Sequence, residues 1–174
     1  MMEELFPLVN EQGVLIGKAT RSLCHSGSFL LHPVVHLHVF NASGQLFLQK
    51  RSLDKDIQPG MWDTSVGGHV DFEETIAGLD WVLPALQREA REELGIIYFM
   101  PIFVMRYSFR SPFEYELVHT YYTVFDGLLT PDPIEISEGR FWDPSEILAN
   151  LGKGLFTPNF EGEVAQVLKF YLAK

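Results

Sequence analysis

The sequence predicts one α/β or α+β domain in which helices pack on a mixed β-sheet. The chain has 174 residues, of which 47% are apolar. A domain of roughly 150–200 residues buries about 70% of its unfolded surface, which is enough for a core without disulfides. Runs of strand-forming residues are intermixed with segments of helical periodicity, and no internal repeat is present. These observations favour a single domain over residues 1–174 and argue against a disordered chain.

Strand signals dominate the first half of the chain. Leu5–Asn10 and Val14–Thr20 flank a short glycine-containing turn, which is typical of a β-hairpin. Val34–Phe40 is predicted as a strand, and the turn cluster Asn41–Gly44 leads into a returning strand over Gln45–Arg51. Both segments therefore predict antiparallel pairs.

Helix signals are clearer in the second half. Helical residues follow Glu73–Thr75 and end at Leu94, because Gly95 is a typical residue after a helix end. Asp143 is predicted as an N-cap with Pro144 in the first helical position. The other expected elements are β-rich runs over Ile96–Phe109 and Glu114–Phe125, a loop over 126–139, a short strand Arg140–Trp142, a helix reaching Asn150 and a C-terminal helix Phe160–Leu172.

The charge balance limits the partners. There are 13 Lys and Arg against 23 Asp and Glu, so the net charge is −10. A nucleic-acid polymer is excluded as a general partner, since phosphate backbones require a basic surface. One small phosphorylated ligand bound through a metal ion remains compatible with this charge. Cys24 is the single cysteine, which excludes a disulfide framework. No signal peptide or membrane segment is expected, so the predicted location is cytoplasmic, and a homodimer is left open.

The most informative segment is the helix before Gly95. Glu89, Glu92 and Glu93 are spaced i, i+3 and i+4, which places three carboxylates on one helical face. One interpretation is a solvated face relieved by Arg88. The other is a divalent-cation site, because oxygen ligands suit Mg²⁺ or Mn²⁺.

The surrounding residues resemble the Nudix box, the signature of Nudix hydrolases. That pattern is G, five residues, E, seven residues, then R-E-U-x-E-E-x-G-U, where U is aliphatic. Gly68 and Glu74 match the first part, and Arg88–Ile96 matches the second, with Ala90 at an aliphatic position. The resemblance implies a Nudix α/β/α sandwich, with a mixed sheet between helices and the box at 68–96 as loop-helix-loop.

One departure concerns the middle of the box. Thirteen residues separate Glu74 from Arg88 where the pattern has seven, a surplus of six. Pro84 disfavours helix at the residue before it and suits a first turn, and Asp80 is a plausible cap. We therefore predict that residues around Gly78–Pro84 interrupt the helix, so that Glu74 still approaches Arg88.

The Nudix resemblance also implies roles. Glu89, Glu92 and Glu93 would hold Mg²⁺ or Mn²⁺, and Arg88 with Glu74 would form a supporting ion pair. The implied reaction is hydrolysis of a diphosphate bond in a small molecule, expected to be a nucleoside diphosphate derivative. A general base is required, and the candidates are Glu92, Glu116 and Glu138. The alternative without catalysis is a ligand-sensing Nudix domain, which the complete set of helix carboxylates disfavours.

The chain is also similar to type 1 isopentenyl-diphosphate isomerase over about residues 5–142. The similarity includes the V-N-x-x-G-x-x-x-G-K-A-T-R opening, L-Q-K-R-S at 48–52, P-G-x-W at 59–62 and S-V-x-G-H at 65–69. It implies a second metal site, whose ligands would be His25, His32, His69, Glu114 and Glu116. Alternatively, His69 belongs to a G-G-H-V form of the Nudix box, and His25 and His32 are ordinary loop residues.

The isomerase resemblance fails at one catalytic position. The cysteine that the isomerases need beside the Gly-His pair is Gly67 here, and glycine cannot transfer a proton. Isomerase activity is therefore disfavoured relative to hydrolysis. Gly67 and Gly68 are expected to form a substrate-contacting turn over Trp62, and Arg51 and Lys55 are candidates to bind phosphates. For Arg51 and Lys55 a solvated loop is the alternative.

Overall fold

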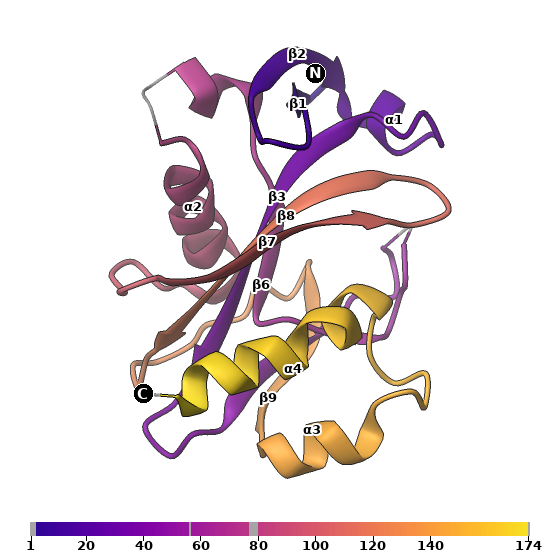
Figure 1. Ribbon diagram of the computed structural model, residues 1–174. Coiled ribbons are helices and arrows are strands. Elements are labelled where there is room, and N and C mark those ends of the chain that lie inside the picture. The colour runs from indigo at the N-terminus through magenta and orange to yellow at the C-terminus, as the bar shows by residue number, and fades with distance from the viewer. Residues whose placement is uncertain (1–2, 56, 77–79, 174) are drawn as a thin grey trace.

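The computed structural model describes residues 3–55, 57–76 and 80–173. Figure 1 shows a twisted central sheet with α2 on one side and α3 and α4 on the other. The elements are β1 (Leu5–Val9), β2 (Leu15–Thr20), α1 (Arg21–Cys24), β3 (Leu31–Phe40), β4 (Leu46–Arg51), β5 (Trp62–Asp63), β6 (Val66–His69), the 3₁₀ helix η1 (Phe72–Ile76), α2 (Val82–Leu94), β7 (Ile102–Arg110), β8 (Tyr115–Val124), β9 (Ile136–Trp142), α3 (Pro144–Asn150) and α4 (Pro158–Leu172).

Among the described residues the main sheet has seven strands, and their directions are mixed, as the sequence predicts. β3 pairs in parallel with β8 along its whole length, and the other pairs are antiparallel. The other edge of β3 is divided: β6 pairs with Val34–Leu37, whereas β4 meets β3 only at Phe40. β6 and β4 therefore occupy different parts of the same edge of β3, with β6 beside its middle and β4 at its end. The predicted hairpin β1–β2 is a separate two-stranded sheet.

Two apolar clusters fill the spaces on either side of the sheet. One joins odd-numbered residues of β3, such as Val35 and Leu37, to the apolar side of α2. The other joins Phe40 to Phe160 and Val164 of α4. Because side chains alternate along a strand, the even-numbered histidines of β3 lie on the α4 side with Phe40. Within the described residues, no helix is long and apolar enough to cross a membrane.

The predicted interruption of the box helix is confirmed, but it is shorter than predicted because Val82–Pro84 already belong to α2. Glu74 belongs to η1, and α2 begins only at Val82. The N-cap of α2 is Trp81, which has no side-chain cap, and the Asp80 carboxylate just before it accepts the free Leu83 N–H of the first turn at 3.3 Å. Residues 77–79, the start of the predicted break, lie outside the described part of the chain. Pro84 falls in the first turn, where it removes no helical hydrogen bond.

Several boundaries and one local conformation differ from the predictions. β9 begins at Ile136 because residues before Arg140 already pair with β4, and β7 begins only at Ile102. Gly67 and Gly68 belong to β6 rather than to a turn, and neither has a positive φ. Trp62 packs edge-to-face against Trp142, with ring centroids 5.0 Å apart, and not beneath a glycine turn.

Candidate active site

Arg88 organises the acidic face of α2. Its guanidinium lies 2.9 Å from Glu74 Oε1, 2.7 Å from Glu89 Oε1 and 3.4 Å from Glu92 Oε2. It also donates to the His69 carbonyl at 2.8 Å. Arg88 thus ties η1, β6 and α2 together, and the predicted approach of Glu74 is confirmed.

The carboxylates of α2 differ in exposure. The side chain of Glu92 is 54% exposed, whereas that of Glu89 is 14% exposed and Glu93 is buried. Glu93 Oε2 accepts hydrogen bonds from Gln49 at 2.9 Å and from the Gly67 N–H at 3.2 Å. Both donors are neutral. The solvated-face interpretation therefore fails for two of the three carboxylates.

Burial makes the ionised form of the α2 carboxylates unfavourable. Burial raises the pKa of Glu93 to about 8; the charge of Glu89 adds to this shift, and the hydrogen bonds from Gly67 and Gln49 oppose it. Burial also raises the pKa of Glu89 to about 7, although Arg88 opposes the shift. Carboxylates that are hard to ionise in a buried position fit a divalent cation, which would supply the missing positive charge.

Gly68 allows strand β6 to approach α2 closely. A Cβ atom at position 68 would collide with the Glu89 carboxylate. Gly68 therefore makes room for a candidate metal ligand, and does so in an ordinary extended strand. Gly67, the preceding residue, faces the opposite side of the sheet, where a Cβ atom would meet the side chain of its cross-strand partner His36.

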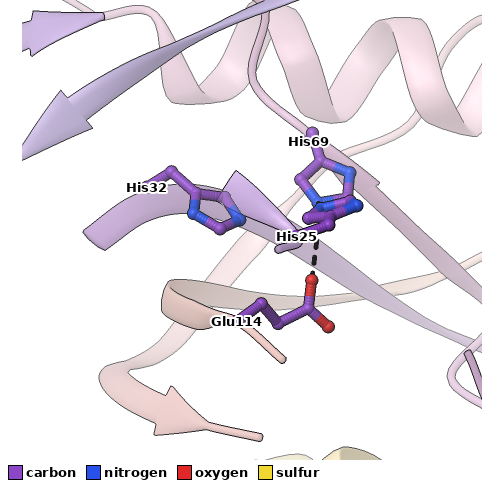
Figure 2. Close-up of side chains that lie close together, drawn as sticks. All are labelled: His25, His32, His69 and Glu114. Atoms are coloured by element: carbon purple, nitrogen blue, oxygen red, sulfur yellow. Dashed lines mark hydrogen bonds and ion pairs between the residues drawn. The ribbon is translucent and has the colours of Figure 1, made fainter. Parts of the chain in front are cut away.

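A second cluster of candidate ligands lies on the α4 side of β6. One potential ligand atom from each of His25, His32, His69 and Glu114 lies within 4.8 Å of the others. Figure 2 shows the three rings grouped on one side of the Glu114 carboxylate, and His25 Nε2 lies 3.2 Å from Glu114 Oε2. The structure thus brings together four of the five residues expected from the isomerase resemblance.

The histidines of this cluster suit metal binding. Among the described residues, His32 Nε2 is buried and has no hydrogen-bond partner, while its Nδ1 lies 2.8 Å from the Leu30 carbonyl. Burial lowers the pKa of His32 to about 4 and that of His69 well below its usual value. Neutral imidazole is the ligand form. Phe6 of the N-terminal hairpin stacks on His69, with ring centroids 4.4 Å apart, and so packs against one side of the cluster.

Glu116 and Glu138 differ from the expectations. Glu116 is outside the four-residue group, and its carboxylate accepts a hydrogen bond from Asn159 at 3.1 Å. Burial and the charge of Glu114 raise the pKa of Glu116 to about 8. Glu138 lies on β9 with its side chain 54% exposed, near Lys50, and is not among the described residues that line the clefts. The structure does not bring Glu138 to the site; Glu135 is there instead.

Two adjoining clefts meet at β6. A cleft of about 500 Å³ lies over the carboxylates of α2, and one of about 380 Å³ lies on the α4 side near Glu114 and Glu116. All four predicted substrate-binding residues line both clefts: Arg51, Lys55, Gly67 and Gly68. Arg51 is oriented by Asp63 at 3.3 Å, and Lys55 pairs with Glu135. A single ligand can therefore reach from one cleft into the other.

Sequence reasoning missed several residues of the α4-side cleft. His36, Asp63 and Asn159 line it, and Glu163 lies buried behind it. The available signal was a polar pair spaced i, i+4 on the apolar face of the C-terminal helix. Glu163 is buried with Phe160 and Val164, and the half-buried Asn159 contacts Glu116 and Tyr107. Polar groups withdrawn from solvent in this way need partners.

A mixed sheet between helices, with a carboxylate-bearing helix against a glycine of β6, defines the Nudix class of fold and site. The NUDIX domain family model matches residues 30–160. A Nudix hydrolase of Listeria monocytogenes is 34% identical over 163 residues, covering 91% of this chain and 90% of that protein. The solved structure of DR0079 from Deinococcus radiodurans has a TM-score of 0.74 and 27% identity, and covers 96% of this chain and 98% of that one.

The chain belongs to the Nudix family. The predicted family and fold are thus confirmed, and members of this family generally hydrolyse pyrophosphate bonds with divalent metals. The resemblance to isopentenyl-diphosphate isomerases is also found among the relatives. An isopentenyl-diphosphate Delta-isomerase of Clavibacter sepedonicus is 27% identical over 151 residues, covering 83% of this chain and 76% of that protein.

The raised pKa values of two buried groups, Glu93 and His36, predict that the stability of the protein depends on pH. The pKa values of Glu93 and His36 are raised to about 8 and about 9, so the folded state holds more protons than the unfolded chain from about pH 6.5 upward. The free energy of unfolding of metal-free protein should therefore fall by on the order of 4–5 kcal/mol between about pH 6.5 and pH 9.

Urea unfolding in EDTA at the two pH values measures this fall. Saturating Mg²⁺ should reduce it, because the cation favours the same ionised carboxylates. A metal-free protein that is equally stable at both pH values would contradict the burial of these groups.

Proposed function

We propose that this protein hydrolyses a diphosphate bond in a small molecule and requires Mg²⁺ or Mn²⁺. The observation that carries the proposal is a pair of α2 carboxylates that face β6: Glu93 is buried among neutral donors, and Glu89 is largely withdrawn from solvent beside Arg88. We further propose a nucleoside diphosphate derivative as substrate, acted on in the cytoplasm.

Each residue has a defined part in this proposal. Glu89, Glu92 and Glu93 hold the cation, which when bound neutralises diphosphate charge and lowers the pKa of water. Arg88 holds two of these carboxylates in place and is itself fixed by Glu74. Glu92 is the candidate base that lines the same cleft as the other two carboxylates. Arg51 and Lys55 contact phosphate oxygens at the junction of the clefts.

Metal-dependent phosphate release tests the function. A panel of nucleoside diphosphate derivatives is incubated with the protein and either Mg²⁺, Mn²⁺ or EDTA. Hydrolysis of the diphosphate bond yields two phosphomonoesters, which are measured as the phosphate that an added phosphomonoesterase releases from them. We expect turnover of at least one compound with metal and none in EDTA. Turnover that persists in EDTA, or no turnover across the panel with either metal, contradicts the proposal.

A second candidate function is isomerisation of a prenyl diphosphate. The cluster of His25, His32, His69 and Glu114 supports it, since a buried nitrogen-rich group suits a transition metal more than Mg²⁺. Gly67 argues against it, because this position offers no acid or base beside Glu116. We therefore rank hydrolysis first, with the second cluster as a proposed additional metal site.

Deuterium exchange separates the two candidates. We expect no deuterium incorporation into isopentenyl diphosphate by the wild type in D₂O. We expect none with Gly67→Cys either, although the structure accepts the side chain: a Cβ atom there would lie 3.5 Å from His36 and Thr64, an ordinary contact. Exchange by the wild type would establish isomerase chemistry. Exchange by the variant alone would show that the cleft still binds prenyl diphosphates productively.

A further inference from the structure

A buried carboxylate of α4 holds a histidine at the floor of the α4-side cleft. Glu163 Oε1 lies 2.8 Å from His36 Nδ1 and 2.9 Å from His38 Nε2. Glu163 Oε2 accepts from the Thr120 hydroxyl at 2.8 Å and lies 2.9 Å from the Tyr107 hydroxyl. The carboxylate is fully buried, so these contacts fix the orientation of both imidazole rings.

The second nitrogen of His36 faces the cleft. His36 lines this cleft together with Gly67, Glu116 and Asn159. A Cβ atom at position 67 would lie 3.7 Å from His36 Nε2, so the absence of a side chain at Gly67 leaves that nitrogen uncovered. Among the described residues, none forms a hydrogen bond with His36 Nε2. A polar group in this position needs a partner from the ligand or from water.

His38 provides an internal comparison. It contacts the same oxygen of Glu163 but is completely buried, and it is not among the described residues that line either cleft. The two histidines therefore share one buried anchor, and of the two only His36 lines the cleft.

The charge state of His36 makes its second nitrogen a donor. Burial alone would lower the pKa of His36, but the charge and hydrogen bond of Glu163 outweigh this and raise the pKa to about 9. Both ring nitrogens then carry hydrogen at neutral pH. A ligand that matches this floor presents a hydrogen-bond acceptor, for which an oxygen is suited, and a hydrocarbon would bury the donor without a partner.

We propose that His36 is a specificity-determining residue, which donates through Nε2 to an oxygen of the organic group attached to the diphosphate. The cleft thereby selects substrates with an oxygen-bearing group, such as a nucleoside, over hydrocarbon diphosphates. The inference rests on the proposed function for the placement of the diphosphate beside α2. The two clefts share Arg51 and Lys55, so a diphosphate there directs its attached group toward Gly67 and His36.

Binding of two diphosphates tests the proposal. Calorimetry with Mg²⁺ compares adenosine diphosphate with dimethylallyl diphosphate, using wild type, His36→Leu and the matched control His38→Leu. The wild type should bind adenosine diphosphate at least about 100-fold more tightly, since a site built to hydrogen-bond an oxygen rejects analogues that lack it. His36→Leu should remove at least about ten-fold of this preference. His38→Leu perturbs the same anchor and should keep the preference.

A second variant covers the case in which His36→Leu does not fold. Gly67→Val places methyl groups over His36 Nε2 and leaves the Glu163 contacts intact, so it should reduce the preference as well. Equal binding of the two probes by wild type, or equal loss of both in His36→Leu and Gly67→Val, overturns the proposal. The protein could bind adenosine diphosphate in a His36-dependent manner without hydrolysing it. That result supports the specificity inference and counts only against hydrolysis of that compound.

Discussion

Replacing Glu93 with glutamine should lower kcat by at least about 100-fold on any substrate that the phosphate-release panel identifies. Glu93 is the deepest carboxylate of the α2 face, and its hydrogen bonds to Gln49 and the Gly67 N–H hold it toward β6. A carboxamide keeps an acceptor for these donors but loses the negative charge that a cation requires. The loss should therefore appear in turnover with Mg²⁺ or Mn²⁺ and not in folding.

The thermal midpoint of the same variant separates catalysis from stability. Because burial raises the pKa of Glu93 to about 8, a neutral side chain is compatible with this position, and the metal-free variant should unfold at or above the wild-type temperature. Glu73→Gln is the matched control, since Glu73 is exposed and is not among the described residues lining the clefts. It should retain wild-type turnover. Near-normal activity of Glu93→Gln with Mg²⁺ would exclude Glu93 as a metal ligand.

The parts of the site that local spacing determines were predictable. The i, i+3, i+4 spacing of Glu89, Glu92 and Glu93 depends only on helical geometry. The break before α2 was readable because Asp80 and Pro84 act within one turn of a helix end. Likewise, Gly95 marks the end of α2, where its φ is 70°.

The remaining parts depend on sheet register and long-range packing. His36 contacts Glu163 from 127 residues away, through the parallel pairing of β3 with β8 and the packing of α4 on that face. A one-residue shift of β6 would exchange the environments of Gly67 and Gly68. No local pattern fixes that register, so the sequence could not show which glycine faces Glu89 and which faces His36.

The opposite orientations of these two glycines lead to the second large expected effect. Gly68→Ala should lower the affinity for Mg²⁺ or Mn²⁺ by roughly 10–100-fold, comparable to the loss of a group that positions a metal ligand. The added methyl group would occupy the space of the Glu89 carboxylate and push it away from Glu93. The displaced atoms are the end of a flexible side chain, so the backbone of β6 can remain in place and the fold should survive.

Gly67→Ala is the control for this substitution, because it adds the same methyl group to the next residue of the same strand. Its Cβ atom would face His36 and Thr64 at 3.5 Å, on the side of the sheet away from α2. Metal affinity, measured by calorimetry without substrate, should therefore be unchanged in Gly67→Ala and reduced in Gly68→Ala. Equal affinities in the two variants would show that Glu89 is not a ligand. A loss in Gly67→Ala alone would place the measured ion at the histidine cluster, since Gly67 shares its face of the sheet with His69.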